Sequence, residues 1–202
     1  MHPILGLALA YLVGSIPSAY LAGRLKRVDL REHGSGNLGA TNVLRVLGWR
    51  VALPVFLADI LKGVLPVLLL TPWTTTSQPE RWAIAYGLAA IMGHVRPVFL
   101  LWKGGGKGVA TAAGVFLALT PIPTLIALVV FIGVLLGWGY VSLGSLSAAV
   151  ALPVAVALLD GWRTPVLLVA VLVAVFVFWT HRANIGRLRR GEEHRFGRKT
   201  VA

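Results

Sequence analysis

The stretch VATAAGVFLALTPIPTLIALVVFIGVLL, residues 109–136, decides the fold that this sequence predicts. It contains no charged residue, and it is longer than the roughly 20 apolar residues that a helix needs to cross about 30 Å of hydrocarbon. The stretch forms either one long tilted helix or two short helices. A break would fall at Pro121 and Pro123, because proline removes a backbone donor from the helical ladder.

The number of crossings follows from this choice, since further apolar runs lie at 3–23, 51–71, 82–101, 145–160 and 163–180. One helix in 109–136 gives six crossings and puts the basic first loop and the basic tail on opposite sides. Two helices give seven crossings and put both on one side, as positive charge in cytoplasmic loops favours. We therefore expect an all-α, polytopic membrane helical bundle with seven transmembrane helices, the amino terminus outside and the carboxyl terminus cytoplasmic.

Composition supports a membrane protein of one domain. Hydrophobic residues make up 57% of the chain, charged residues 13%, and the mean hydropathy is +0.80, which is outside the range of soluble domains. No polar stretch is long enough to form a second domain, so we expect a single membrane domain over residues 1–202. The amino-terminal run lacks the features of a cleaved signal peptide and is expected to stay as a span. Without cysteine, thiolate nucleophiles, disulfides and thiolate metal sites are excluded.

The net charge of +12 is concentrated in two segments. These are the first loop (Arg24, Lys26, Arg27, Arg31, Arg45, Arg50) and the tail (Arg182, Arg187, Arg189, Arg190, Arg195, Arg198, Lys199). This placement predicts cytoplasmic orientation and contact with membrane lipid, and it disfavours nucleic acid as a partner. Arg187, Arg189 and Arg190 are expected to be lipid-facing anchors.

The first polar loop, HGSGNLGATNVLR at residues 33–45, has the composition of an anion site. Its glycines at 34, 36 and 39 permit positive φ and close backbone approach. Polar donors come from Ser35, Asn37, Thr41 and Asn42. If a helix begins at Ala40, Thr41 and Asn42 share a face with Arg45, and a phosphate would meet the helix dipole and the guanidinium. The alternative is a glycine-rich turn with a basic anchor.

The second polar segment is the glycine loop, KGGGKG at residues 103–108. It combines bare backbone donors with two ammonium groups ahead of a new helix, which suits phosphate binding, although it is not a Walker A loop. The alternative is a flexible loop with snorkelling lysines. His94 precedes this loop and is either a ligand or a packing residue. The residues of the loop are Lys103, Gly104, Gly105, Gly106, Lys107 and Gly108.

Two more pairs of polar residues follow helical spacing. His181 and Asn184 are at i and i+3 at a membrane boundary, where one group can share a proton and the other can orient a substrate. Ser142 lies in a small polar turn on the same predicted face. Asp59 and Lys62, also i and i+3, lie inside an apolar run, where charge is costly unless paired. Structural pairing and a functional site both remain open for them.

Metal and serine-nucleophile chemistry are not indicated. There is no H-E-x-x-H motif, the five histidines are scattered, and no G-x-S-x-G elbow is present. We expect no metal and no cofactor. The sequence instead favours a reaction in which the substrates bring the activation with them.

Several motifs together resemble the acyl-phosphate-dependent glycerol-3-phosphate acyltransferase family of bacterial membranes, the PlsY type. They are GSGNLGATNVLR, DILKG, GHVRPVF, GGKGVAT, HRANIGRL and GEE, and they cover nearly the whole chain in order. The glycine loop departs from the family pattern by having three glycines between its lysines instead of two. Of the two lysines we favour Lys107 as the phosphate-facing one, because it keeps its register with the following helix.

The resemblance implies transfer of a fatty acyl group from acyl phosphate to the 1-hydroxyl of glycerol-3-phosphate, giving lysophosphatidic acid and phosphate. This would be the first step of bacterial phospholipid synthesis, on the cytoplasmic face of the cytoplasmic (inner) membrane, with no obligate protein partner. His181 and Asn184 are the candidates beside the attacking hydroxyl. The candidates for phosphate or substrate binding are Ser35, Gly36, Asn37, Thr41, Asn42, Arg45, Lys62, His94, Lys103, Gly104, Gly105, Gly106, Lys107, Gly108 and Ser142.

Other function classes are less well supported by the sequence. Thioester-dependent transfer is disfavoured, because no histidine is followed by aspartate after four residues. An organic-phosphate transporter would also need basic anion sites, and only Asp59 and Lys62 inside a span favour it. Transporters place their site at the midplane between repeated halves, whereas the polar groups here gather at one face and no repeat is evident. A scaffold that binds anionic lipid is a third hypothesis.

Overall fold

The computed structural model describes residues 1–196 and is helical, with no strand in that range. The chain divides into two compact units, Met1–Leu119 and Thr120–Ala202. Arg198 and Lys199 of the basic tail lie outside the described residues. Each unit is built from apolar helices that proline and glycine separate.

The first unit contains α1 (Pro3–Gly14), α2 (Ser18–Leu25), α3 (Ala40–Leu47), α4 (Trp49–Leu65), α5 (Pro79–Val95) and α6 (Val109–Leu119). A π-helical turn, η1 (Pro66–Leu70), extends α4, and a 3-10 turn, η2 (Val98–Leu100), follows α5. Pro17 separates α1 from α2, because it has no N–H for a continuous helix. Gly48, at φ +81°, makes the turn between α3 and α4.

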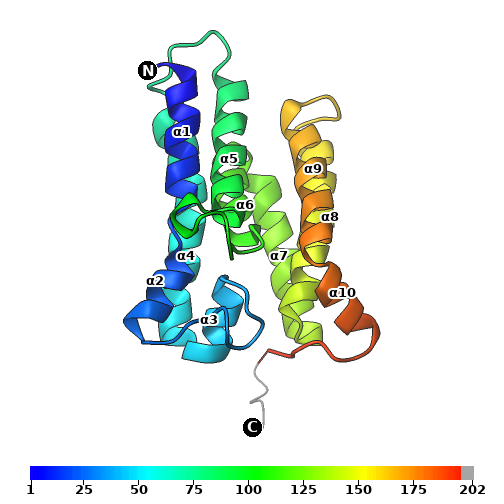
Figure 1. Ribbon diagram of the computed structural model, residues 1–202. Coiled ribbons are helices and arrows are strands. Elements are labelled where there is room, and N and C mark those ends of the chain that lie inside the picture. The colour runs from blue at the N-terminus through cyan, green and yellow to red at the C-terminus, as the bar shows by residue number, and fades with distance from the viewer. Residues whose placement is uncertain (197–202) are drawn as a thin grey trace. The chain divides into compact units, whose positions relative to one another are not determined.

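Close helix contacts hold the first unit together. α1 lies beside α5, and α4 packs against α6 (Figure 1). A Cβ on Gly14 would overlap the backbone of Ala90, and one on Gly63 would overlap the backbone of Thr111. Small residues at these crossings let the backbones meet, which is how helices pack in lipid, where burial of apolar surface adds little.

The second unit contains α7 (Pro121–Trp138), α8 (Val141–Leu159), α9 (Pro165–Thr180) and α10 (Arg182–Arg189). α8 packs against both α7 and α9, and α10 bends from α9 by 60° (Figure 1). Thr164 caps α9 by accepting a hydrogen bond from the N–H of Leu167. The expected break is confirmed, since α6 ends at Leu119 and α7 begins at Pro121.

Five helical segments of the described chain are long and apolar enough to cross a membrane, or six if α9 and α10 form one bent span. The five are Pro3–Leu25, Trp49–Leu70, Pro79–Leu100, Pro121–Trp138 and Val141–Leu159. α6 has 11 residues and is about 16 Å long, half the hydrocarbon thickness. Length and composition thus support five or six crossings. The predicted total of seven is reached only if α6 also crosses the membrane.

Candidate functional site

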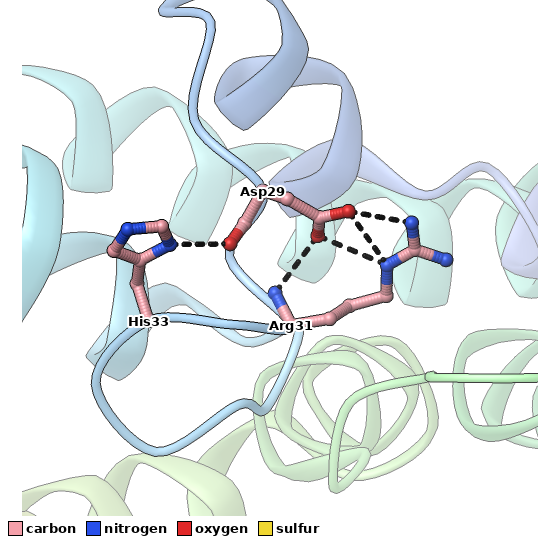
Figure 2. A network of polar contacts seen from close by, with 3 residues as sticks. All are labelled: Asp29, Arg31 and His33. Carbon is pink, nitrogen blue, oxygen red and sulfur yellow. Dashed lines mark hydrogen bonds and ion pairs between the residues drawn. The ribbon is translucent and has the colours of Figure 1, made fainter.

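An ion pair fixes the entrance to the first polar loop (Figure 2). The guanidinium of Arg31 donates to both carboxylate oxygens of Asp29, at 2.6–3.2 Å, and the N–H of Arg31 donates to the same carboxylate at 3.0 Å. These bonds lower the pKa of Asp29 to about 2. The Nδ1 of His33 donates to the Asp29 carbonyl at 2.8 Å. The chain is therefore ordered before the glycines begin.

Asn42 braces the first polar loop from inside. Its side chain is 1% exposed and donates to the carbonyls of Leu30 and His33 at 3.1 and 3.0 Å. It also accepts the N–H of Ser35 at 2.9 Å. Asn42 was predicted to contact phosphate, but these three bonds direct its amide toward the loop backbone. A buried amide is satisfied by such bonds, so its contribution is to the shape of the loop.

The rest of the first polar loop agrees with the prediction in part. Gly34 and Gly36 have positive φ, +64° and +68°, as expected, whereas Gly39 is extended and caps α3. α3 begins at Ala40, so Thr41 and Asn42 do precede Arg45 on one helix. The side chains of Ser35 and Thr41 are exposed, and that of Arg45 is half-buried.

The glycine loop is seated on the end of α5. The N–H of Gly106 donates to the carbonyl of His94 at 3.2 Å, and a Cβ on Gly106 would overlap the His94 ring. A Cβ on Gly105 would overlap the carbonyl of Val95. Gly104 and Gly108 have φ of +72° and +82°. Lys103 is exposed and Lys107 is half-buried. Only glycine fits this path, for reasons of space in the middle and of backbone conformation at both ends.

The two polar loops contact each other within the first unit. The amide of Asn37 donates to the carbonyl of Gly105 at 3.5 Å, across 68 residues of sequence. A Cβ on Gly104 would lie 3.4 Å from the Arg31 side chain. The sequence predicted two separate phosphate cradles, but the structure makes them neighbouring parts of one polar surface.

A buried charge cluster lies below the glycine loop. Lys62 pairs with Asp59 at 2.8 Å, and the hydroxyl of Ser18 donates to the same Asp59 oxygen. The Nδ1 of His94 lies 3.7 Å from that oxygen. A small pocket is lined by Ser18, Lys62, His94 and the glycines at 104–106, among others. Lys62 and His94 are therefore close to the glycine loop.

In the second unit, His181 lies at the bend between α9 and α10 and is 3% exposed. Its Nδ1 is 2.8 Å from the carbonyl of Val177, so Nδ1 carries a proton. Asn184 is also buried, in the first turn of α10. The sequence predicted that His181 and Asn184 share a helical face. His181 is the N-cap of α10, where its carbonyl accepts the N–H of Ile185 at 2.9 Å, so both residues lie in the first turn of α10, after the 60° bend from α9.

Glu193 joins three side chains of the second unit. Its Oε1 accepts from Asn184 at 2.7 Å and from Ser142 at 3.0 Å, and its Oε2 accepts from Arg187 at 2.7 Å. Burial raises the pKa of Glu193, but the hydrogen bonds outweigh burial and the pKa is lowered overall. Arg187 was predicted to be a lipid-facing anchor. That prediction is wrong, because its guanidinium pairs with Glu193.

Comparison with known proteins decides the family. Residues 4–191 match the family model described as glycerol-3-phosphate acyltransferase. The chain belongs to this family. A glycerol-3-phosphate acyltransferase of Geotalea daltonii is 48% identical over 189 residues, 94% of this chain and 95% of the relative. That of Geobacter metallireducens is 51% identical over 193 residues, 96% of this chain and 97% of the relative.

Two solved structures of a member of the family have the same fold. They are crystal structures of PlsY (YgiH), an integral membrane glycerol 3-phosphate acyltransferase, in a glycerol 3-phosphate form and a lysophosphatidic acid form. The first has a TM-score of 0.88 and 41% identity and covers 96% of each chain. The second has a TM-score of 0.85 and 40% identity and covers 96% of this chain and 95% of that one. With its apolar helices, this acyltransferase family member is an integral membrane protein of the PlsY type.

The sequence analysis did not assign Glu193 to the site, and for Asp59 it left structural pairing and a functional role both open. The available signal for Glu193 was a carboxylate within a strongly basic tail, where it has several cationic partners to choose from. In residues 1–196 the structure brings no three His, Asp or Glu side chains together as a metal site. The polar groups of the two polar loops, residues 33–45 and 103–108, are cations, amides, hydroxyls and backbone N–H groups, which suit anionic substrates.

Proposed function

We propose that this protein transfers a fatty acyl group from acyl phosphate to the 1-hydroxyl of glycerol-3-phosphate, giving lysophosphatidic acid and phosphate. This is the first step of bacterial phospholipid synthesis. The observation that carries the proposal is the polar surface of the first unit, where the glycine loop meets the first polar loop. Membership of the glycerol-3-phosphate acyltransferase family supports the acceptor, and the glycerol 3-phosphate and lysophosphatidic acid forms of PlsY support acceptor and product.

The chemistry requires positioning more than covalent catalysis. The acceptor hydroxyl attacks the carbonyl carbon of the acyl phosphate, and a new C–O bond forms as the carbonyl becomes an oxyanion. The oxyanion then collapses, the C–O bond to phosphate breaks, and phosphate departs with the electron pair. Acyl phosphate is an activated anhydride, so no protein nucleophile is needed. The protein holds two phosphate groups in place and stabilises the developing charge.

We assign phosphate binding to the cations and backbone donors of the two polar loops. The side chains are Arg45, Lys103 and Lys107, with Ser35, Asn37 and Thr41 as neutral donors. The backbone donors are those of Gly104, Gly105 and Gly108. The N–H groups of Gly36 and Gly106 donate to the carbonyls of His33 and His94, so these two glycines contribute to the shape of the loops. Arg45 offers a fork-shaped contact that a lysine does not reproduce. Asn42 contributes by holding the first polar loop in shape.

His181, Asn184 and Ser142 are assigned to the acceptor hydroxyl. The bond from Nδ1 of His181 to Val177 makes Nε2 the basic nitrogen of the neutral ring. If Nε2 takes the proton of the acceptor hydroxyl, the ring becomes an imidazolium, and the Val177 carbonyl still stabilises it through Nδ1–H. The proton from the hydroxyl passes either to His181 or to the departing phosphate.

We further propose that the whole chain works as one membrane domain with the reaction on the cytoplasmic face of the bacterial inner membrane. The family model spans residues of both compact units, which supports one functional domain. Seven crossings, with the amino terminus outside, put both polar loops and the basic tail on the cytoplasmic side. This topology counts the short helix α6 as a crossing, so it predicts that the glycine loop and Thr120 face opposite sides of the membrane. Because the chain has no cysteine, single cysteines placed in each loop test this topology by labelling from either side.

The transporter alternative loses its main support. It was favoured by Asp59 and Lys62 inside a span, but these side chains are paired with each other and with groups of the α1–α2 break. A charge pair with that many local partners is explained without a transported ion.

The test is release of inorganic phosphate by the purified protein from palmitoyl phosphate, with and without glycerol-3-phosphate, and with palmitoyl-CoA as the rival donor. We expect release that depends on glycerol-3-phosphate and falls by about 10²-fold in His181→Ala, the usual size of an acid–base contribution. The matched control is His194→Ala, an exposed histidine of the tail, which should retain full activity. Transfer from palmitoyl-CoA alone would overturn the proposal that acyl phosphate is the donor. No transfer from either donor would overturn the proposed acyltransferase activity.

A further inference from the structure

Asp59 is the centre of the buried charge cluster and the residue with the most polar partners in it. It is 1% exposed, inside the Trp49–Leu70 span. One carboxylate oxygen accepts from Ser18 and pairs with Lys62 at 2.8 Å, while Nδ1 of His94 lies 3.7 Å away. A buried charge is tolerated only when it is paired in this way. Pairing explains why the buried charge is tolerated, but it does not explain why charged residues stand at this position of an apolar span.

The cluster ties α4 to the break between α1 and α2. Asp59 reaches the start of α2 through Ser18, and Lys62 donates to the carbonyl of Ile16 at 3.0 Å. Ile16 precedes Pro17 at the point where the first span is interrupted. Both members of the ion pair thus fix the same interruption, and two protons of the Lys62 ammonium are used for Asp59 and Ile16.

The same cluster supports the glycine loop through His94. The His94 ring lies between Asp59 and Gly106, where a Cβ would overlap it, and the His94 carbonyl holds the N–H of Gly106. Among the described residues the buried Nδ1 of His94 has no hydrogen-bond partner, so the ring is placed by packing and by the charge of Asp59. A shift of the cluster therefore moves the seat of the glycine loop.

We propose that Asp59 is a positioning residue, which acts through Lys62 and His94 to hold the glycine loop at the height where its backbone donors meet a substrate phosphate. Lys62, predicted as a substrate ligand, serves inside this cluster instead. The inference rests on the proposed acyl transfer for its kinetic test. A second readout does not need activity.

The kinetic test compares Asp59→Asn with the wild-type protein. Asn keeps the volume but leaves Lys62 without its counter-charge. We expect the KM for one of the two phosphate-bearing substrates to rise about tenfold, the equivalent of one charged hydrogen bond, with kcat changed less than about twofold. Ser18→Ala, which removes one partner of Asp59, should shift the same KM by less. It keeps the test available if Asp59→Asn does not fold.

The matched control is Asp160→Asn. Asp160 belongs to the second unit and also accepts a hydroxyl hydrogen bond, from Thr120 at 2.5 Å. This variant should leave both KM values unchanged. Equal effects of Asp160→Asn and Asp59→Asn, or a loss of kcat with both KM values unchanged, would overturn the proposal in favour of general stabilisation.

A double variant separates positioning from direct substrate binding by Lys62. If Lys62 acts through its pair with Asp59, Asp59→Asn with Lys62→Met should be no worse than the more impaired single variant, since coupled residues are non-additive. A further tenfold loss in the double variant would make Lys62 a substrate ligand and overturn the assignment.

The readout without activity uses a single thiol. The natural chain has no cysteine, so Lys103→Cys places one reactive group on the exposed start of the glycine loop. We expect its maleimide labelling rate to change by about threefold or more when Asp59→Asn is added, and not when Asp160→Asn is added. An unchanged rate would overturn the proposal even in an active enzyme. A changed rate, together with no transferase activity in the protein that retains Lys103, would leave the positioning role standing and refute only the proposed function.

Discussion

Gly105→Ala is the substitution for which the structure gives the sharpest expectation. A Cβ at this position would lie 2.5 Å from the carbonyl carbon of Val95 and 2.6 Å from the carbonyl oxygen of His94, whereas ordinary contacts begin at 3.4 Å. Both obstacles are backbone atoms at the end of α5, so the glycine loop must move by about 1 Å. A displacement of this size at a binding site costs about 10²-fold in rate, or roughly 2.7 kcal/mol of transition-state stabilisation.

The assay is phosphate release as kcat/KM, on protein shown to be folded by its thermal transition. Gly104→Ala is the informative neighbour, because there the nearest atom is 3.4 Å away but φ is +72°. Its cost is backbone strain of about 1–2 kcal/mol, so activity should fall by about tenfold or less. Gly133→Ala in α7, where nothing lies within 4 Å, should have no effect on activity. A folded Gly105→Ala protein with more than a third of wild-type activity would refute the steric argument.

Three further predictions concern the polar contacts. Glu193→Gln removes the charge that Arg187 meets and one acceptor for buried Asn184 and Ser142, so thermal unfolding should show a loss of about 1–3 kcal/mol. Glu192→Gln, whose pair with Arg190 is exposed, should cost almost nothing, and equal losses would contradict the network. Because the folded pKa of Glu193 is lowered, its stabilisation is present above the ordinary Glu pKa of about 4.3 and should be lost as the pH falls below it. Asn42→Asp replaces a donor by a carboxylate oxygen facing the carbonyls of Leu30 and His33, so trypsin should cleave the first polar loop faster, and unchanged cleavage would count against the brace. The Asp29 carboxyl should titrate near pH 2 by carbon NMR and move toward about 3.9 in Arg31→Ala, whereas a wild-type midpoint near 3.9 would exclude the ion pair.

Local sequence features were sufficient for several parts of the fold. The helix break at Thr120 was predictable because Pro121 and Pro123 act on the backbone next to them. The start of α3 at Ala40 and the positive φ of Gly34 and Gly36 were predictable for the same reason. The number of crossings was harder to predict, because a hydrophobic run shows that a segment is apolar and not how deeply an 11-residue helix such as α6 enters the bilayer.

The partners of the polar side chains were decided by tertiary structure. Asn42 has the same residue type whether it faces a substrate or the carbonyls of Leu30 and His33, and only the folded loop shows the second case. In the sequence Arg187 is one of several basic residues of the tail, and only the folded structure shows that it pairs with Glu193. Contacts between residues as distant as Asn37 and Gly105 depend on how helices pack, which periodicity does not encode.

The sequence by itself therefore determined the membrane class, the helical elements, the family motifs and the residue types able to bind phosphate. These follow from hydropathy, backbone restrictions and side-chain chemistry, which are properties of a residue and its near neighbours. The tertiary structure alone decided that the two polar loops meet, that Asp59, Lys62 and His94 lie beneath the glycine loop, and that Glu193 joins Ser142, Asn184 and Arg187. The physical reason is that a buried polar group takes its partners from whatever the packing brings within about 3 Å, at any separation along the chain.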